Sequence, residues 1–147
     1  MKRLLTCQCS ATWNSTALFV LRLAVGLAFF MHGWQKIAGG VEGVAGFLGS
    51  IGFPMATFFA FILMWVEFLG GLALILGVAT HLAAKLLGVV MVMALLFVHI
   101  GNLGAGLPNG YLVAGGGPEL VLVLLAGCLV LMSTGPGKWA LMKHNSA

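Results

Sequence analysis

The residues of this chain that could do chemistry are ionisable side chains inside or at the ends of long apolar runs. Four of them form a candidate outer cluster: His32, Lys36, His99 and Glu119. Counted at 1.5 Å per residue along helices, His32, His99 and Glu119 fall within roughly 5 Å of the same membrane face. His32 and Lys36 are four residues apart, so both lie on one side of their helix. The cluster could donate hydrogen bonds to a quinone headgroup, bind a metal or haem, or hold an anion.

A structural role is the alternative for this cluster. The imidazoles and the carboxylate could satisfy one another and the exposed amides at helix ends. Glu119 stands in the first turn of its helix, where the helix dipole favours a carboxylate in any case. An ionisable group within a membrane span is nevertheless a functional candidate by default, because its burial is costly. Both interpretations stay open at this point, and the cofactor is unknown, with quinone as the leading candidate.

A metal or haem is less strongly indicated. The chain has no His-x-x-x-His or Glu-x-x-His pair, so metal ligands would have to converge from separate helices. His32, His99 and Glu119 are the only candidates for such a set, and no metal site is assigned with them.

The three cysteines and the familiar catalytic motifs add little. Cys7 and Cys9 form a C-x-C pair in a polar segment, which we interpret as two reduced thiols rather than a metal or lipidation site. Cys128 stands alone in an apolar run, so a redox disulfide is not expected there. No Gly-x-Gly-x-x-Gly, P-loop or Cys-x-x-Cys motif is present. The chain is therefore not expected to be catalytic alone.

Arg22 and Glu67 lie deeper in the apolar runs. Counted from the outer ends of the first two predicted spans, each is roughly 18–20 Å into the membrane. Opposite charges at one depth on neighbouring antiparallel helices predict a buried ion pair that joins the two helices. A proton or ligand site is the functional alternative.

The low content of charged residues indicates that these ionisable side chains lie in a lipid environment rather than in water. Of 147 residues, 61% are hydrophobic and 7% are charged, and the mean hydropathy is +1.13. A soluble domain carries roughly a quarter charged residues. Ten charged side chains cannot cover an aqueous surface, so the chain is expected to lie mostly in lipid. A soluble enzyme, a disordered segment and a nucleic-acid-binding module are excluded, despite a pI near 9.3.

Four long apolar runs predict an all-α integral membrane four-helix bundle in a single domain, residues 1–147. A span needs about 20 apolar residues. The predicted spans cover about 17–35, 55–76, 82–100 and 118–132, with Pro54 before the second and Gly135-Pro136-Gly137 after the fourth.

A glycine at every third position separates the first two spans, from Gly40 to Gly52. We weigh two structures for this series. One is a short interfacial or re-entrant helix whose bare glycine stripe packs against the bundle. The other is a flexible loop, because periodicity alone does not decide between them.

The distribution of basic residues predicts the orientation. With four spans, both chain ends share one side with the turn between the second and third spans. That side holds most of the cations, namely Lys2, Arg3, Lys85, Lys138 and Lys143, whereas the other side has only Lys36. By the positive-inside rule, both termini are expected in the cytoplasm.

Together these features resemble the DoxX family of small four-helix prokaryotic membrane proteins. The resemblance covers about Leu18 to Leu141. It rests on Leu21-Arg22 with Gly26, His32-Gly33-x-x-Lys36, Gly52-Phe53-Pro54, Glu67-x-x-Gly70-Gly71 with Gly77, Thr80-His81, His99, Pro118-Glu119 and Gly135-Pro136-Gly137. The sequence departs from the family in two places. His81 stands where the family often has a basic residue, and the aspartate that often ends the Gly-Pro-Gly segment is missing.

The resemblance implies an accessory subunit of a membrane redox system in the prokaryotic inner membrane. The family is named for a subunit associated with a thiosulfate:quinone oxidoreductase, and relatives are linked to sulfur and oxidative stress. Expected partners are the lipid bilayer and other protein subunits or further copies of the chain, with no nucleic acid. The alternatives are a noncatalytic membrane scaffold or anchor and, less strongly indicated, a small-molecule transporter, since four short helices show no internal repeat.

Overall fold

A computed structural model describes residues 11–100 and 118–142, and every regular element in these ranges is helical. The elements are α1 (Ala11–Gly39), α2 (Val41–Ser50), α3 (Ala56–Leu76), α4 (Thr80–Met93) with a π-helical continuation η2 (Ala94–Ile100), and α5 (Pro118–Thr134). The predicted all-α membrane fold is confirmed. Three stretches are long and apolar enough to cross a bilayer, Trp13–Gly39, Ala56–Leu76 and Thr80–His99, and α5 is a shorter apolar helix of 17 residues.

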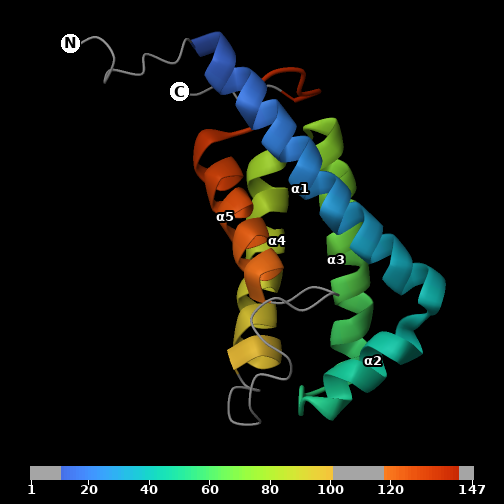
Figure 1. The fold of residues 1–147 in the computed structure, drawn as a ribbon. Coiled ribbons are helices and arrows are strands. Elements are labelled where there is room, and N and C mark those ends of the chain that lie inside the picture. The colour runs from blue at the N-terminus through green and yellow to red at the C-terminus, as the bar shows by residue number, and fades with distance from the viewer. Residues whose placement is uncertain (1–10, 101–117, 143–147) are drawn as a thin grey trace.

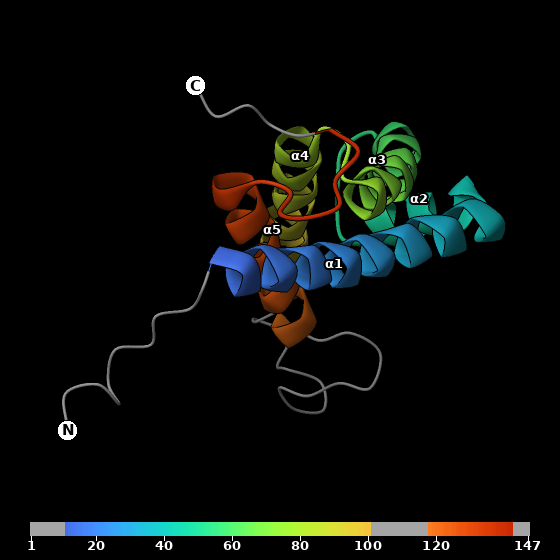
Figure 2. The same cartoon turned by 90° about the horizontal axis from the view of Figure 1, so that it is seen from above.

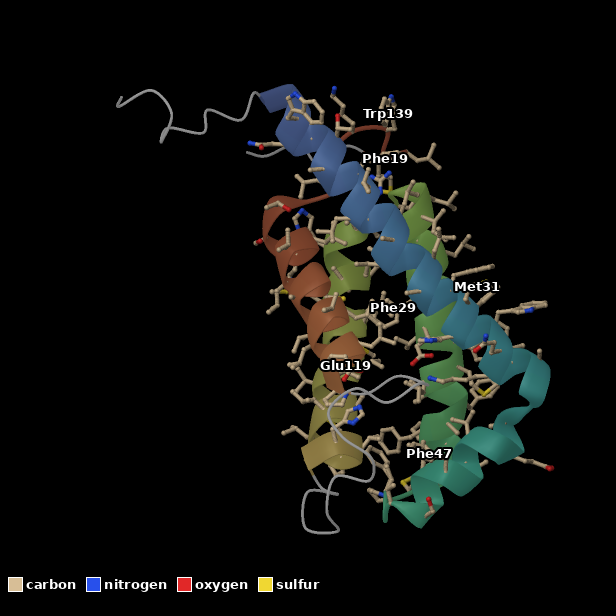
Figure 3. All side chains as sticks on the ribbon, in the orientation of Figure 1. Phe19, Phe29, Met31, Phe47, Glu119 and Trp139 are labelled. Carbon is tan, nitrogen blue, oxygen red and sulfur yellow. The ribbon has the colours of Figure 1, made fainter. Side chains whose placement is uncertain are left out.

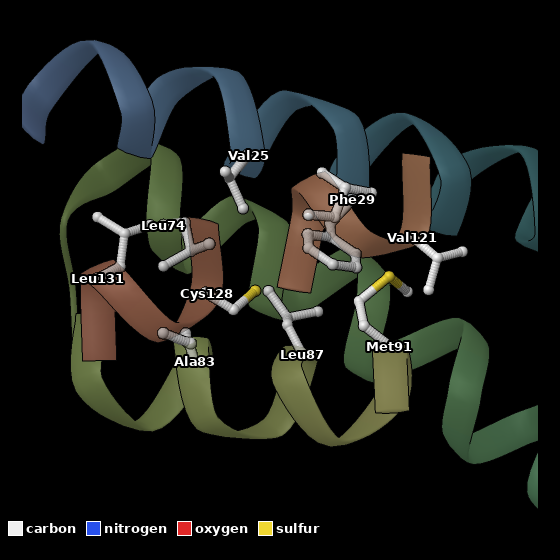
Figure 4. Close-up of a cluster of buried hydrophobic side chains, with 11 residues drawn as sticks. Val25, Phe29, Leu74, Ala83, Leu87, Met91, Val121, Cys128 and Leu131 are labelled. Atoms are coloured by element: carbon white, nitrogen blue, oxygen red, sulfur yellow. The ribbon is translucent and has the colours of Figure 1, made fainter. Parts of the chain in front are cut away.

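The long helices pack around a small core between α1, α3, α4 and α5. Figure 1 shows α4 and α5 side by side, with α1 running diagonally across the other helices. Phe29, Leu74, Leu87 and Leu131 have no exposed surface, and they contact one another through a cluster drawn from all four helices (Figure 4). Many large apolar side chains instead point outward. This distribution is typical of a bundle whose outer surface contacts lipid rather than water.

Glycines set the register between α1 and α3. A Cβ atom on Gly33 would collide with the backbone of Phe68, and one on Gly71 would collide with the backbone of Phe30. The two helices therefore approach each other at backbone distance, as small residues allow in membrane bundles. This antiparallel contact fixes which residues of α1 and α3 share a level.

The glycine series between the first two spans is helical. Residues Val41–Ser50 form α2, which packs against α3 through the buried Leu48. A short helix, rather than a flexible loop, is thus the correct alternative, but the predicted packing of its glycine stripe is wrong. Gly43 and Gly46 are exposed, and a Cβ atom at either would meet nothing within 4 Å. The helix turns its bulkier side chains, not its glycines, to the bundle.

Residues 135–142, here named the closing segment, cross the end of the bundle over α4 (Figure 2). Backbone N–H groups of Lys138, Leu141 and Met142 donate to the carbonyls of Ser15, Leu76 and Gly77. These bonds join the closing segment to the start of α1 and the end of α3. The ends of the described chain therefore lie at the same end of the bundle.

Arg22 fastens the closing segment from inside. Its side chain has no exposed surface, and its guanidinium donates to the carbonyl of Pro136 at 2.7 Å and to that of Trp139 at 3.1 Å. The ring of Phe19 lies against the guanidinium at 5.3 Å and against the Trp139 ring at 4.8 Å. Arg22 thus replaces the water that would otherwise satisfy these carbonyls.

Replacing Arg22 by methionine is expected to loosen the closing segment. The change keeps an apolar chain of similar length but leaves two part-buried carbonyls without this donor. An unpaired group that is fully buried costs about 1–3 kcal/mol, which is the upper limit for each of them. We expect hydrogen exchange at the amides of Lys138, Leu141 and Met142 to become at least about ten-fold faster. Exchange in the middle of α3 should stay unchanged. If these three amides exchange at the same rate in the variant as in the wild type, Arg22 does not hold the closing segment in place.

Candidate functional site

A buried ion pair occupies the contact between α1 and α3. The Lys36 ammonium donates to both carboxylate oxygens of Glu67, each at 2.5 Å. The Glu67 side chain is only 4% exposed, whereas that of Lys36 is 29% exposed. Glu67 stands about 16 Å along α3 from its first residue, close to the middle of the helix. The pair therefore joins a buried carboxylate near the middle of α3 to a partly accessible ammonium in the last turn of α1.

The predicted pair between Arg22 and Glu67 is wrong. Glu67 bonds Lys36, and Arg22 bonds the closing segment. The predicted pairing assumed that the end of the first span and the start of the second lie at the same level in the membrane. In the structure α1 continues to Gly39, and the contact of Gly33 with Phe68 aligns Glu67 with the last turns of α1. Arg22 lies instead beside Gly77, at the other end of α3.

Aromatic rings from α1 and α3 pack on one another close in sequence to the ion pair. Phe68, next to Glu67, stacks on Phe30 at 4.9 Å and contacts Trp34 at 6.1 Å. Trp65 lies edge-on to Phe68 at 6.2 Å. We name Phe30, Trp34, Trp65 and Phe68 the aromatic wall. Both tryptophans are exposed, so the wall offers ring faces and edges to a planar molecule in the bilayer.

The rest of the predicted outer cluster is spread over three elements. His32 is exposed on α1, one turn before Lys36. His99 is half-buried on η2. Glu119 is half-buried in the first turn of α5 (Figure 3), and its Oε2 atom is buried without a hydrogen-bond partner among residues 11–100 and 118–142.

Glu119 and His32 lie at a similar height along the bundle, but their helices are not close together there. Gly127 of α5 contacts Val25 of α1. Counted from this contact, Glu119 and His32 are each about 10–12 Å along their helices, at similar levels. However, α1 and α5 diverge in both views of the ribbon (Figures 1 and 2). Within the described part of the chain, no group of three or more His, Cys, Asp or Glu residues could hold a metal ion. His32, His99 and Glu119 are therefore not gathered into a metal site.

Two features of the site were missed at the sequence level. The true partner of Glu67 follows from the glycine contacts, because Gly33 and Lys36 are one turn apart on α1. The aromatic wall had a visible signal as well, since Trp34, Trp65 and Phe68 flank the two charged residues in sequence.

Comparison with known proteins places the chain in a family. The DoxX family model matches residues 17–100. This chain belongs to the DoxX family. The DoxX match includes both residues of the ion pair and all four residues of the aromatic wall.

Three relatives of this DoxX protein are informative. A Mycobacterium tuberculosis protein named "Uncharacterized membrane protein Rv3486" is 34% identical over 132 residues, which cover 86% of this chain and 79% of that protein. A Haemophilus influenzae protein named "Uncharacterized protein" is 33% identical over 82% of this chain and 84% of its own length. The Bacillus subtilis protein "Putative oxidoreductase CatD" is 35% identical over 55% of this chain. That alignment spans 58% of CatD, less than two thirds of its length. No solved structure matches this DoxX protein.

Proposed function

We propose that this DoxX protein is a membrane subunit of a redox assembly and that it binds a quinone headgroup beside the Lys36–Glu67 pair. The observation that carries the proposal is the partly exposed ammonium of Lys36, held in the last turn of α1 by a buried carboxylate of α3, with the aromatic wall on the same two helices. The name of the B. subtilis relative, "Putative oxidoreductase CatD", agrees with such a role.

The chemistry of a quinone fits these groups. A quinone has a planar ring, two carbonyl oxygens that accept hydrogen bonds, and an apolar tail that keeps it in the bilayer. The ammonium of Lys36 has three donors, and Glu67 occupies the donors on one side. A remaining donor can meet a carbonyl oxygen of the quinone, and the aromatic wall on the same two helices offers ring faces against which a quinone ring can pack. Binding, not electron transfer by this chain alone, is the proposed contribution.

The proposed setting is the prokaryotic inner membrane, with both termini in the cytoplasm and with other subunits or further copies as partners. The cation-rich end of the bundle supports this orientation through the positive-inside rule. A noncatalytic scaffold is the competing function. It predicts that no quinone binds, and that the assembly keeps its activity when the Lys36–Glu67 pair is removed.

Quinone binding can be measured through the tryptophans of the site. In the full chain with Trp13→Phe and Trp139→Phe, reconstituted in nanodiscs, the remaining emission comes from Trp34 and Trp65. We expect a short-chain quinone to quench this emission with saturation. The paired change Lys36→Met with Glu67→Leu, which leaves no buried charge unpaired, should weaken binding at least about ten-fold.

Two controls make this experiment specific. Lys85→Met removes an exposed lysine on α4, outside the site, and should leave the titration unchanged. A ring compound of similar size without carbonyl groups should not saturate. Identical titrations for the paired variant and the parent would mean that quenching reports only partition into lipid, and the proposal would fail.

A further inference from the structure

A second site lies at the end of the bundle that the closing segment covers. A cavity of about 920 Å³ opens there between the start of α1, the start of α4, the end of α5 and the closing segment. Its polar lining comes from Ser15, His81, Ser133, Thr134 and Lys138. The Lys36–Glu67 site does not involve any of these residues, so this cavity needs its own explanation.

The charge around the cavity is positive and uncompensated by the chain's glutamates. Lys138 lines the cavity. Behind the closing segment, the guanidinium of Arg22 is buried, and its described hydrogen bonds go to the carbonyls of Pro136 and Trp139. Both of these residues also line the cavity. A buried cation without a counter-ion is costly, and a nearby anion would lower that cost.

The chain's three carboxylate side chains are elsewhere. Glu42 is on α2, Glu67 is neutralised by Lys36, and Glu119 begins α5. Figure 3 shows Glu119 well away from Trp139, which marks the end that bears the cavity. The electrostatic potential of this end therefore favours an anionic ligand.

The position of the cavity matches the lipid headgroup region. Two tryptophans are exposed at this end of the bundle, Trp13 on α1 (71%) and Trp139 on the closing segment (70%). Exposed tryptophans gather at the membrane–water interface. Apolar helices α1 and α4 begin at the cavity and continue into the bilayer. A ligand held here can therefore place an anionic group in the cavity and acyl chains along the helices.

We propose that this cavity binds the phosphate group of an anionic phospholipid, with Lys138 as the direct cationic contact and Arg22 as a buried charge behind the wall. Ser15 adds a hydroxyl group to the lining, whereas the hydroxyls of Ser133 and Thr134 already donate to the carbonyl of Val130. Inorganic phosphate shares the same chemistry, but it lacks the acyl chains that the adjoining helix surfaces would contact. The lipid is therefore the proposed source of the anion.

Native mass spectrometry of the full chain released from nanodiscs tests this proposal. The nanodiscs contain equal amounts of phosphatidylglycerol and phosphatidylcholine. We expect phosphatidylglycerol to be retained preferentially by the wild type and its retention to fall at least about five-fold in Lys138→Glu. The matched control is Lys85→Glu, which makes the same charge change on an exposed α4 residue outside the cavity. This control should retain the lipid as the wild type does.

Three results would overturn the proposal. Equal retention by the wild type and Lys138→Glu would show that the cavity is not used. Equal loss in both glutamate variants would indicate attraction to overall charge rather than a site. Displacement of phosphatidylglycerol by millimolar inorganic phosphate, with equal protection against thermal unfolding, would assign the cavity to free phosphate. Unchanged circular dichroism of Lys138→Glu controls for folding.

Discussion

Replacing Lys36 by methionine is expected to destabilise the protein by about 3–5 kcal/mol, because it leaves the carboxylate of Glu67 buried without its counter-ion. The side chain of Glu67 is 4% exposed and accepts both of its described hydrogen bonds from Lys36. The free energy of unfolding can be followed in mixed micelles as an increasing fraction of denaturing detergent is added. Hydrogen exchange in α3 should rise in parallel.

The paired variant is the decisive control for this first prediction. Lys36→Met together with Glu67→Leu removes both charges, and replacing a buried ion pair by apolar residues of similar volume is often neutral or stabilising. We expect the pair to recover most of the stability that the single variant loses. A single variant as stable as the wild type would show that Glu67 finds another partner or is protonated. In that case the ion pair would not be a structural constraint.

Replacing Gly33 by alanine is expected to cost about 3 kcal/mol or more, at the upper end of what overpacking usually costs. The added Cβ atom would lie 2.7 Å from the Cα of Phe68 and closer still to its backbone nitrogen. A helix backbone cannot move aside as a flexible side chain can, so α1 and α3 must separate. The separation would also lengthen the Lys36–Glu67 contact, one turn away.

A second glycine provides the control for Gly33→Ala. Gly46→Ala makes the same chemical change on α2, where nothing lies within 4 Å of the new Cβ atom. Because alanine favours a helix over glycine by about 1 kcal/mol, this variant should be as stable as the wild type or slightly more so. Thermal unfolding of the two variants in the same detergent makes the comparison. Similar losses in both variants would mean that the contact of Gly33 with Phe68 does not explain the effect.

The helices were predictable from the sequence because a long apolar run indicates a membrane-spanning helix. Their ends were less so: α1 extends beyond the predicted 17–35 to Ala11–Gly39, because a helix continues past the apolar run when its backbone bonds can continue. That extension is also why Arg22 and Glu67 were paired incorrectly. Register between helices depends on which residues allow close approach, here Gly33 and Gly71, and such contacts are long-range properties.

The candidate site was predictable in its residue types and less so in its grouping. Lys36 and Glu67 were both selected at the sequence level because charges inside a span are costly. Their pairing and the aromatic wall required three-dimensional contacts. The same holds for the closing segment, since no periodic pattern indicates that Pro136 and Trp139 accept hydrogen bonds from a residue more than one hundred positions earlier.

The bonds from Arg22 to the closing segment have a consequence for biosynthesis. The ribosome makes α1 first, and translation proceeds at about 5–20 residues per second. The guanidinium of Arg22 must therefore enter the translocation machinery at least several seconds before Pro136 and Trp139 exist. Throughout that interval its charge has to be accommodated by water, lipid phosphates or an insertion chaperone. Completion of the bundle is thus coupled to the synthesis of its last described residues, and nascent chains arrested before Pro136 should remain exposed to quality-control proteases.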